Sequence, residues 1–78
     1  MLKYQKEDYS IISYICCNRR HVEVVKGYEV LGGVPIWRDV EISIKLSHYG
    51  KRETTQEEID NAIEISKIYI DNLLTNKI

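Results

Sequence analysis

The chain has 78 residues, of which 44% are hydrophobic and 29% are charged, with one proline, four glycines and a formal net charge of −1 at pH 7. This composition excludes a disordered, collagen-like or low-complexity polypeptide, and the length leaves room for one domain, residues 1–78, since domains most often have about 100–150 residues. The small net charge excludes a global field that would draw the protein to nucleic acid or to anionic lipid. A chain of this size buries only about 60% of its unfolded surface, so its core is thin and a partner subunit would add to it.

The N-terminal segment carries little structural information. Residues 1–8 are polar and show no periodicity, so we expect a frayed lead-in or a short helical turn there. This segment has no apolar signal core, and no uninterrupted apolar stretch reaches the roughly 20 residues that a bilayer span requires. We therefore expect a soluble, cytoplasmic protein that does not insert into a membrane.

The first regular element is predicted over residues 9–17. This segment is rich in β-branched and aromatic residues, which favours a strand buried on both faces. A short helix capped by Asp8 is the alternative, because several apolar residues of the segment also fall at helical spacing and nine residues are too few for periodicity to decide.

The segment after this strand predicts a hairpin. Residues 18–20 form a turn, and residues 21–31 then alternate between apolar and polar side chains, as a half-buried strand does. Lys26 falls on the apolar face of that strand and Gly27 follows it, a pairing that indicates a bulge or a kink. The next two glycines supply a turn, and residues 36–46 alternate as a third strand. The apolar face of that strand consists of Ile36, Val40, Ile42, Ile44 and Leu46.

The faces of the two strands predict the register of the hairpin. A three-residue loop, residues 32–34, sets Val24 opposite Ile42 and Val22 opposite Ile44. A two-residue loop would set the same valines opposite acidic and hydroxyl side chains. Because a slip of one residue exchanges the faces of a whole strand, we predict the three-residue loop.

A long C-terminal helix is predicted from Thr54 or Thr55 to about Leu74. Each threonine is followed three residues later by a glutamate, Glu57 or Glu58, so either pair fits a capping box, and the acidic first turn suits the helix dipole. The whole pattern is β-β-β-α. It predicts an α+β fold in which a three-stranded antiparallel meander packs against one long C-terminal helix, with a short helix as the alternative for the first strand.

The predicted helix has more apolar surface than one sheet needs. At 100° per residue, its core face covers about 120° of the circumference. The residues of this face are Ile59, Ala62, Ile63, Ile70, Leu73 and Leu74. Ile65, Ile68 and Tyr69 lie outside it, so either a neighbouring segment covers them or they form the centre of a contact with a second copy or another protein. We favour the contact, because small domains gain by pairing the core that they lack.

The leading functional hypothesis is therefore a small, non-catalytic interaction or regulatory protein that binds another macromolecule, as a homodimer through the helix or a sheet edge. Tyr28, Trp37 and Arg38 form a second candidate interface patch, because aromatic residues and arginine are enriched at interface hot spots. The predicted register sets Tyr28 opposite Arg38, where a cation–π contact would form.

The alternative hypothesis is a nucleic-acid-binding module. Arg19 and Arg20 lie at one predicted turn, and Lys51 and Arg52 lie at another. The two turns would flank a sheet face that carries Trp37. Cations beside an aromatic side chain suit single-stranded nucleic acid. Acidic residues share the predicted solvent face and would repel phosphate, and the net charge is negative, so we rank this hypothesis second.

Other kinds of site have little support. The only residues of the soft metal-ligand types are Cys16, Cys17, His21 and His48. Adjacent cysteines in a strand point to opposite faces, so we predict neither a disulfide nor a zinc site. We therefore expect free thiols, which agree with a reducing compartment. Residues 50–55 hold glycine, two cations and two hydroxyls but lack the P-loop spacing, which indicates a capped loop. No nucleophile and base have recognisable spacing, so we predict no catalytic activity and no cofactor.

Overall fold

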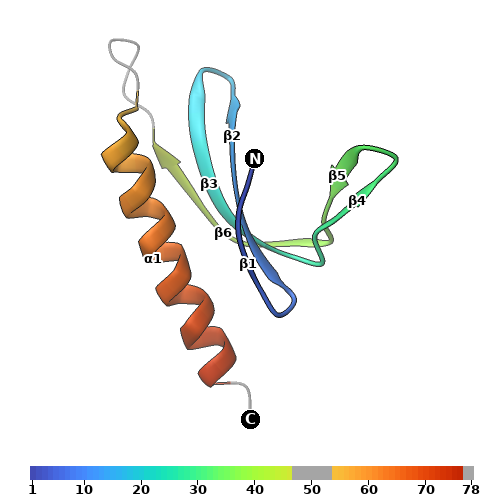
Figure 1. The fold of residues 1–78 in the computed structure, drawn as a ribbon. Helices are drawn as coiled ribbons and strands as arrows, with labels where there is room; N and C mark the ends of the chain where they lie inside the picture. The colour runs from blue at the N-terminus through green and yellow to red at the C-terminus, as the bar shows by residue number, and fades with distance from the viewer. Residues whose placement is uncertain (47–53, 77–78) are drawn as a thin grey trace.

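The computed structural model describes residues 1–46 and 54–76 and has an α+β fold (Figure 1). The strands of the larger, antiparallel sheet are β1 (Leu2–Lys6), β2 (Tyr9–Cys16), β3 (Arg19–Lys26) and β6 (Asp39–Leu46), in the spatial order β1-β2-β3-β6. The smaller sheet consists of β4 (Glu29–Leu31) and β5 (Val34–Ile36), and the helix α1 spans Gln56–Thr75. The predicted α+β class is confirmed, whereas the predicted three-stranded meander lacks one strand and the small sheet.

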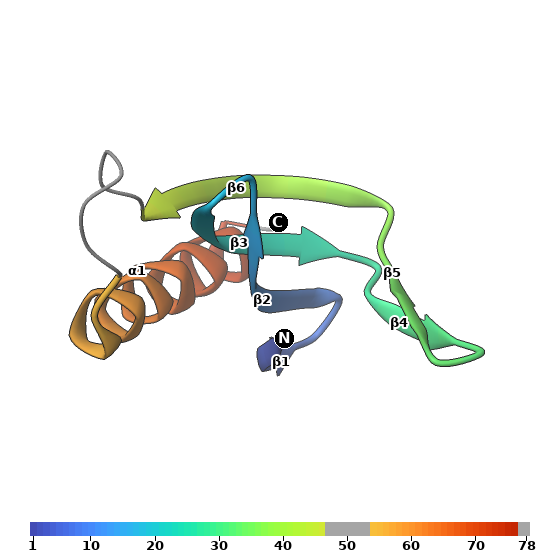
Figure 2. The ribbon, with the colours of Figure 1, turned by 90° about the horizontal axis from the view of Figure 1, so that it is seen from above.

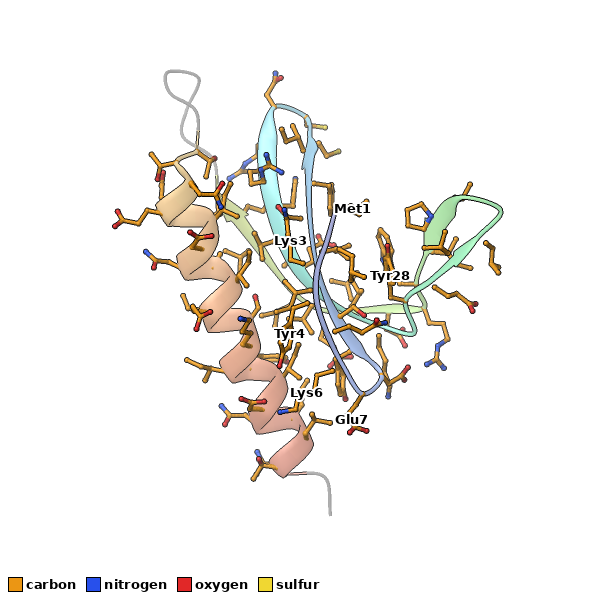
Figure 3. The ribbon with its side chains drawn as sticks, in the orientation of Figure 1. Met1, Lys3, Tyr4, Lys6, Glu7 and Tyr28 are labelled. Atoms are coloured by element: carbon orange, nitrogen blue, oxygen red, sulfur yellow. The ribbon has the colours of Figure 1, made fainter. Side chains whose placement is uncertain are left out.

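The additional strand is β1, which replaces the predicted lead-in. It pairs antiparallel with β2, and Tyr4 lies opposite Ile11 while Lys6 lies opposite Tyr9. Tyr4 packs against the hydrophobic core from this edge, between β1 and α1 (Figure 3). The prediction for residues 1–8 was wrong because an edge strand has only one neighbour and stays solvated elsewhere, so its sequence is polar and shows little alternation.

The segment after β1 is a strand, as predicted, and the helical alternative is excluded. β2 pairs over its whole length with β3, with Ile11 opposite Val24 and Cys16 opposite Arg19. The side chains of Ile11 and Ile12 point to opposite faces and are both fully buried. Burial of both faces explains the nearly continuous apolar run in the sequence.

The hairpin from β3 to β6 combines two registers. Within the sheet, Val24 lies opposite Ile42 and Val22 opposite Ile44, as predicted. A bulge then shifts the pairing, so that Val25 lies opposite Val40. Val40 was predicted on the same face as Ile42, and this placement was wrong because the extra residue in β6 moves Val40 to the other face.

The bulge also changes the turn at the end of the hairpin. Leu31 lies opposite Val34, so the loop has two residues, Gly32 and Gly33, instead of the predicted three. Their φ values of 58° and 82° are those of a type I′ turn, the usual two-residue hairpin loop. The bulge in β6 separates the register of the two-residue turn from the register of β3 and β6. The tight turn is therefore compatible with the pairing of the apolar residues of β3 and β6.

The predicted long strand 21–31 is interrupted at Gly27, in accordance with the expected kink. Gly27 has a φ of 75°, and β4 and β5 continue beyond it as a separate two-stranded sheet. We refer to residues 29–36, which comprise β4, the glycine turn and β5, as the arm. In both views α1 lies on one side of the larger sheet and the arm extends on the other (Figures 1 and 2).

The helix begins as predicted. Thr55 is the N-cap: its hydroxyl accepts a hydrogen bond from the backbone N–H of Glu58, and the Glu58 carboxylate accepts one from the N–H of Thr55. The Thr54 hydroxyl instead donates to the carbonyl oxygen of Leu46, which ties the helix start to the end of β6. In the part of the chain that the structure describes, α1 does not have the apolar length needed to cross a membrane.

The core lies between α1 and the facing side of the sheet. Its buried residues are Tyr9, Ile11, Val22, Val24, Ala62 and Ile70. Side chains that are partly buried against them are Tyr4, Ile42, Ile44, Leu46, Ile63, Tyr69, Leu73 and Leu74. The predicted core face of the helix is confirmed, and Ser66 joins it as a fully buried residue whose hydroxyl donates to the carbonyl oxygen of Ala62.

Candidate interaction surfaces

The arm exposes more apolar surface than any other element described in the structure. Val30, Leu31, Val34 and Ile36 are all large aliphatic residues and are 39% to 58% exposed. Strand alternation places Leu31, Val34 and Ile36 on one face of the arm, together with Glu29, and Val30 with Pro35 on the other. Apart from Glu29 at the start of β4, both faces of the arm are apolar and exposed, whereas a two-stranded sheet exposed to water ordinarily carries polar side chains.

Polar contacts hold the base of the arm against the main sheet. The guanidinium of Arg38 forms an ion pair with Asp8, in the turn between β1 and β2, at 2.8 Å. The backbone N–H of Arg38 donates to the carbonyl oxygen of Lys26, and that of Gly27 donates to the carbonyl oxygen of Asp8. The break in the hairpin is thus fixed by hydrogen bonds on both strands.

The predicted aromatic patch lies at this base but has different partners. Tyr28 stacks on Trp37 with ring centroids 6.4 Å apart and an interplanar angle of 10° (Tyr28 is labelled in Figure 3). The expected cation–π contact between Tyr28 and Arg38 is replaced by this stacking and by the pairing of Arg38 with Asp8. The three residues nevertheless gather at one place, beside the arm.

The helix residues predicted as an interface divide into two groups. Ile65 and Ile68 are 57% and 61% exposed and lie one turn apart on the outer face of α1. Tyr69 instead is partly buried and packs against the core. Two exposed isoleucines remain where three apolar side chains were expected.

The open face of the larger sheet, defined as the face away from α1, combines a polar cluster with an apolar floor. In the cluster, Glu23 is 7% exposed and its Oε2 accepts hydrogen bonds from the Tyr14 hydroxyl and the Ser43 hydroxyl, each at 2.8 Å. These side chains come from three strands, so the carboxylate links β2, β3 and β6. His21 stacks on Tyr14, with ring centroids 4.9 Å apart.

The environment of Tyr14 changes its acidity. Burial, followed by the hydrogen bond to Glu23 and the charge of that carboxylate, raises the pKa of Tyr14 from 10.0 to about 12. Each of these causes disfavours the phenolate. Tyr14 is therefore a neutral donor at physiological pH, and the cluster cross-links the sheet.

The apolar floor lies beside this cluster. Ile12 and Val25 lie on the open face but are fully buried within the chain. The exposed part of the floor therefore consists of their neighbours across the sheet, Leu2 and Val40, which are 42% and 49% exposed. The floor extends from β1 to β6. Strand alternation places it on the face away from α1, and the arm extends on that side of the sheet (Figure 2).

Of the four residues predicted for nucleic-acid binding, the structure describes Arg19 and Arg20. Arg19 and Arg20 begin β3, where strand alternation sends neighbouring side chains to opposite faces. The Arg20 guanidinium donates to the hydroxyl of Ser13 on the helix side of the sheet. Lys51 and Arg52, and the glycine-containing segment around them, lie outside the described residues.

The soft ligand types are arranged differently from the prediction. Cys16 and Cys17 are free and exposed, and their Sγ atoms lie 3.6 Å apart instead of pointing to opposite faces. Within residues 1–46 and 54–76, no group of three or more His, Cys, Asp or Glu side chains gathers at a common point. His48 lies outside the described residues.

The arm is the surface that sequence reasoning missed. Residues 30–37 contain no charged side chain, and two glycines divide this run into halves of hairpin length. These two features together are the available signal, since an uncharged run around a type I′ turn predicts a hairpin without a polar face.

Comparison of the chain with protein-family models, with curated proteins and with solved structures found no match.

Proposed function

We propose that this protein acts by binding another macromolecule and that it forms a homodimer through the arm. The observation that supports the proposal is the group of exposed aliphatic residues on both faces of the arm, within residues 30–36. Exposed apolar patches rimmed by polar residues mark interaction sites, because their burial is driven by the hydrophobic effect. An interaction or regulatory role agrees with a chain this small, which offers few residues beyond its own core.

A second copy of the chain is the partner that suits this surface. Each copy supplies both an exposed apolar arm and the exposed floor residues Leu2 and Val40, so a twofold arrangement would bury each arm against the floor of the other copy. The floor itself is uncharged, and the net charge of −1 per chain produces little repulsion between copies. Ile65 and Ile68 lie outside this seam and form a separate candidate contact surface on the helix.

Two matched double variants test the assignment. Leu31→Lys with Val34→Glu places an ion pair across the arm. The hairpin then keeps a favourable cross-strand pair, while the face that carried Leu31 and Val34 becomes charged. Ile65→Glu with Ile68→Lys makes the same change in charge on the helix, again between side chains that are neighbours. Both variants keep the net charge of the wild-type chain.

Sedimentation equilibrium at low and high salt gives the readout, with circular dichroism to confirm that each variant is folded. We expect a wild-type dimer that salt does not weaken, a monomeric arm variant and a dimeric helix variant, since apolar association is insensitive to added salt or strengthened by it. A dimeric arm variant with a monomeric helix variant would move the seam to Ile65 and Ile68. A wild-type monomer at high micromolar concentration would refute the homodimer.

A further inference from the structure

The turn between β2 and β3 brings two thiols together. β2 ends at Cys16 and β3 begins at Arg19, so Cys17 and Asn18 form a two-residue loop, with left-handed φ values of 55° and 63°. Because Cys17 leaves the extended conformation, its side chain no longer points away from that of Cys16, and the two Sγ atoms lie 3.6 Å apart. Both residues are exposed, so a solute can reach both sulfur atoms.

The backbone disfavours a disulfide between these sulfurs. A disulfide usually joins Cα atoms about 4.4–6.8 Å apart, through an S–S bond of about 2.05 Å. The peptide bond between Cys16 and Cys17 is trans, which holds adjacent Cα atoms about 3.8 Å apart. The Cα atoms are therefore too close for an unstrained disulfide, and an atom that bridges the two sulfurs at longer range suits this turn better.

A thiolate-bound cation matches the observed separation. Zinc–sulfur bonds are about 2.3 Å long and meet at a tetrahedral angle, which sets two thiolates on one ion about 3.8 Å apart. The observed Sγ–Sγ distance of 3.6 Å needs almost no change to reach that value. Thiolates are soft ligands and select soft or borderline metal ions over magnesium or calcium.

We propose that Cys16 and Cys17 form a two-thiolate chelate for a single thiophilic d10 cation of the Zn²⁺ or Cd²⁺ type. Each thiol gives its proton to the solvent as its metal–sulfur bond forms, so one divalent ion replaces two protons and no electron is transferred. Since no third side chain of the described residues joins the pair, water or a small thiol completes the coordination. The site is open and exchangeable, unlike a structural zinc site with four protein ligands.

Titration of the reduced full chain with Cd²⁺ tests the proposal through the thiolate-to-cadmium charge-transfer band in the ultraviolet. We expect the band to saturate at one ion per chain and both thiols to lose their reactivity towards a disulfide reagent. Cys16→Ser and Cys17→Ser should each weaken binding by about 100-fold, because the second sulfur then no longer binds intramolecularly.

A relocated pair provides the matched control. Ile15→Cys with Cys17→Ser keeps two adjacent cysteines but places both in β2, where their side chains alternate between the faces of the sheet. This variant should bind Cd²⁺ as weakly as the single-cysteine variants. Tight binding by the relocated pair would show that the turn geometry is irrelevant, and would overturn the proposal. One ion per two chains, with association on sedimentation, would also overturn it by showing a bridge between copies, as would the absence of the band in the wild-type protein.

Discussion

At the scale of single residues, the sheet contains one buried carboxylate that serves as a shared acceptor. Leaving the Glu23 carboxylate buried without partners would cost several kcal/mol, roughly, and the two hydroxyls that donate to it offset much of this cost. Tyr14 and Ser43 lie on the strands on either side of Glu23. The cluster therefore selects one pairing of three strands, which apolar contacts alone specify less strictly.

The raised pKa of Tyr14 predicts a late-titrating tyrosine. Phenolate absorbance should show a titration step near pH 12, and Tyr14→Phe should remove that step. The folded pKa of Tyr14 lies above the ordinary value of 10.0, so its contribution to stability is complete below pH 10 and is lost as the pH rises through about 12.

Two variants separate the causes of this shift. Glu23→Gln removes the charge and should lower the pKa of Tyr14 only part of the way from about 12 towards 10.0, because burial is the larger cause. Ser43→Ala leaves the carboxylate in place and should leave the late step unchanged. The absence of a step near pH 12 in the wild-type protein would contradict the raised pKa of Tyr14.

At the scale of elements, the hinge between β3 and β4 decides where the arm points. Gly27 has a φ of 75°, and a Cβ atom added there would meet the guanidinium of Arg38. The same guanidinium pairs with Asp8 in the turn between β1 and β2. Glycine is favoured at this position by its left-handed backbone conformation, and an added Cβ atom would also displace the end of the flexible Arg38 side chain.

Gly27→Ala should therefore destabilise the protein by more than about 1 kcal/mol, measured as the shift of the urea midpoint at constant m-value. Adding Arg38→Ala to Gly27→Ala should recover part of the loss, because the clash is then absent while the backbone strain remains.

A second glycine provides the control for the hinge. Gly32→Asn should change stability by less than about 0.5 kcal/mol, since a Cβ atom there meets open space and asparagine tolerates the left-handed conformation of a type I′ turn. Equal losses for Gly27→Ala and Gly32→Asn would show that the close approach of Arg38 is not what restricts the hinge.

At the scale of the whole molecule, the main hydrophobic core is one layer of side chains between the helix and the larger sheet. The shortest extent of the chain is 16 Å and the longest is 44 Å, so the protein is thin and the arm projects from it. A core of this size depends on few side chains, of which Ile70 is the largest fully buried residue of α1. Loss of any one of them removes a large share of the total stability.

Two isoleucines of α1 test this distribution. Ile70→Ala should destabilise the monomer by about 2–5 kcal/mol, because it leaves a cavity in the core. Ile68→Ala, two residues away on the exposed face, makes the same chemical change and should cost less than about 0.5 kcal/mol. Urea unfolding of both variants gives the comparison, and similar losses would contradict the packing of α1 described above.

Much of the fold follows from local patterns in the sequence. The capping box at Thr55 and the 3.6-residue periodicity that places Ile59 and Ile70 on one face determine where α1 begins and which side it buries. The β-branched run of residues 9–16 determines a strand, and the alternation around Val24 determines its pairing with β6. These features depend on residues within one or two turns, or on one hairpin, so neighbouring residues are enough to specify them.

Tertiary structure decided the features that depend on distant partners. β1 is a strand only because β2 offers it an edge, and the placement of Val40 depends on a bulge that lets the tight glycine turn coexist with the register at Val24. The approach of the Cys16 and Cys17 thiols results from the left-handed backbone of a hairpin turn, which reverses the alternation expected in a strand. The exposure of the arm was decided in the same way: an apolar sequence predicts burial, and only the path of the chain past Gly27 shows that the rest of the molecule does not cover it.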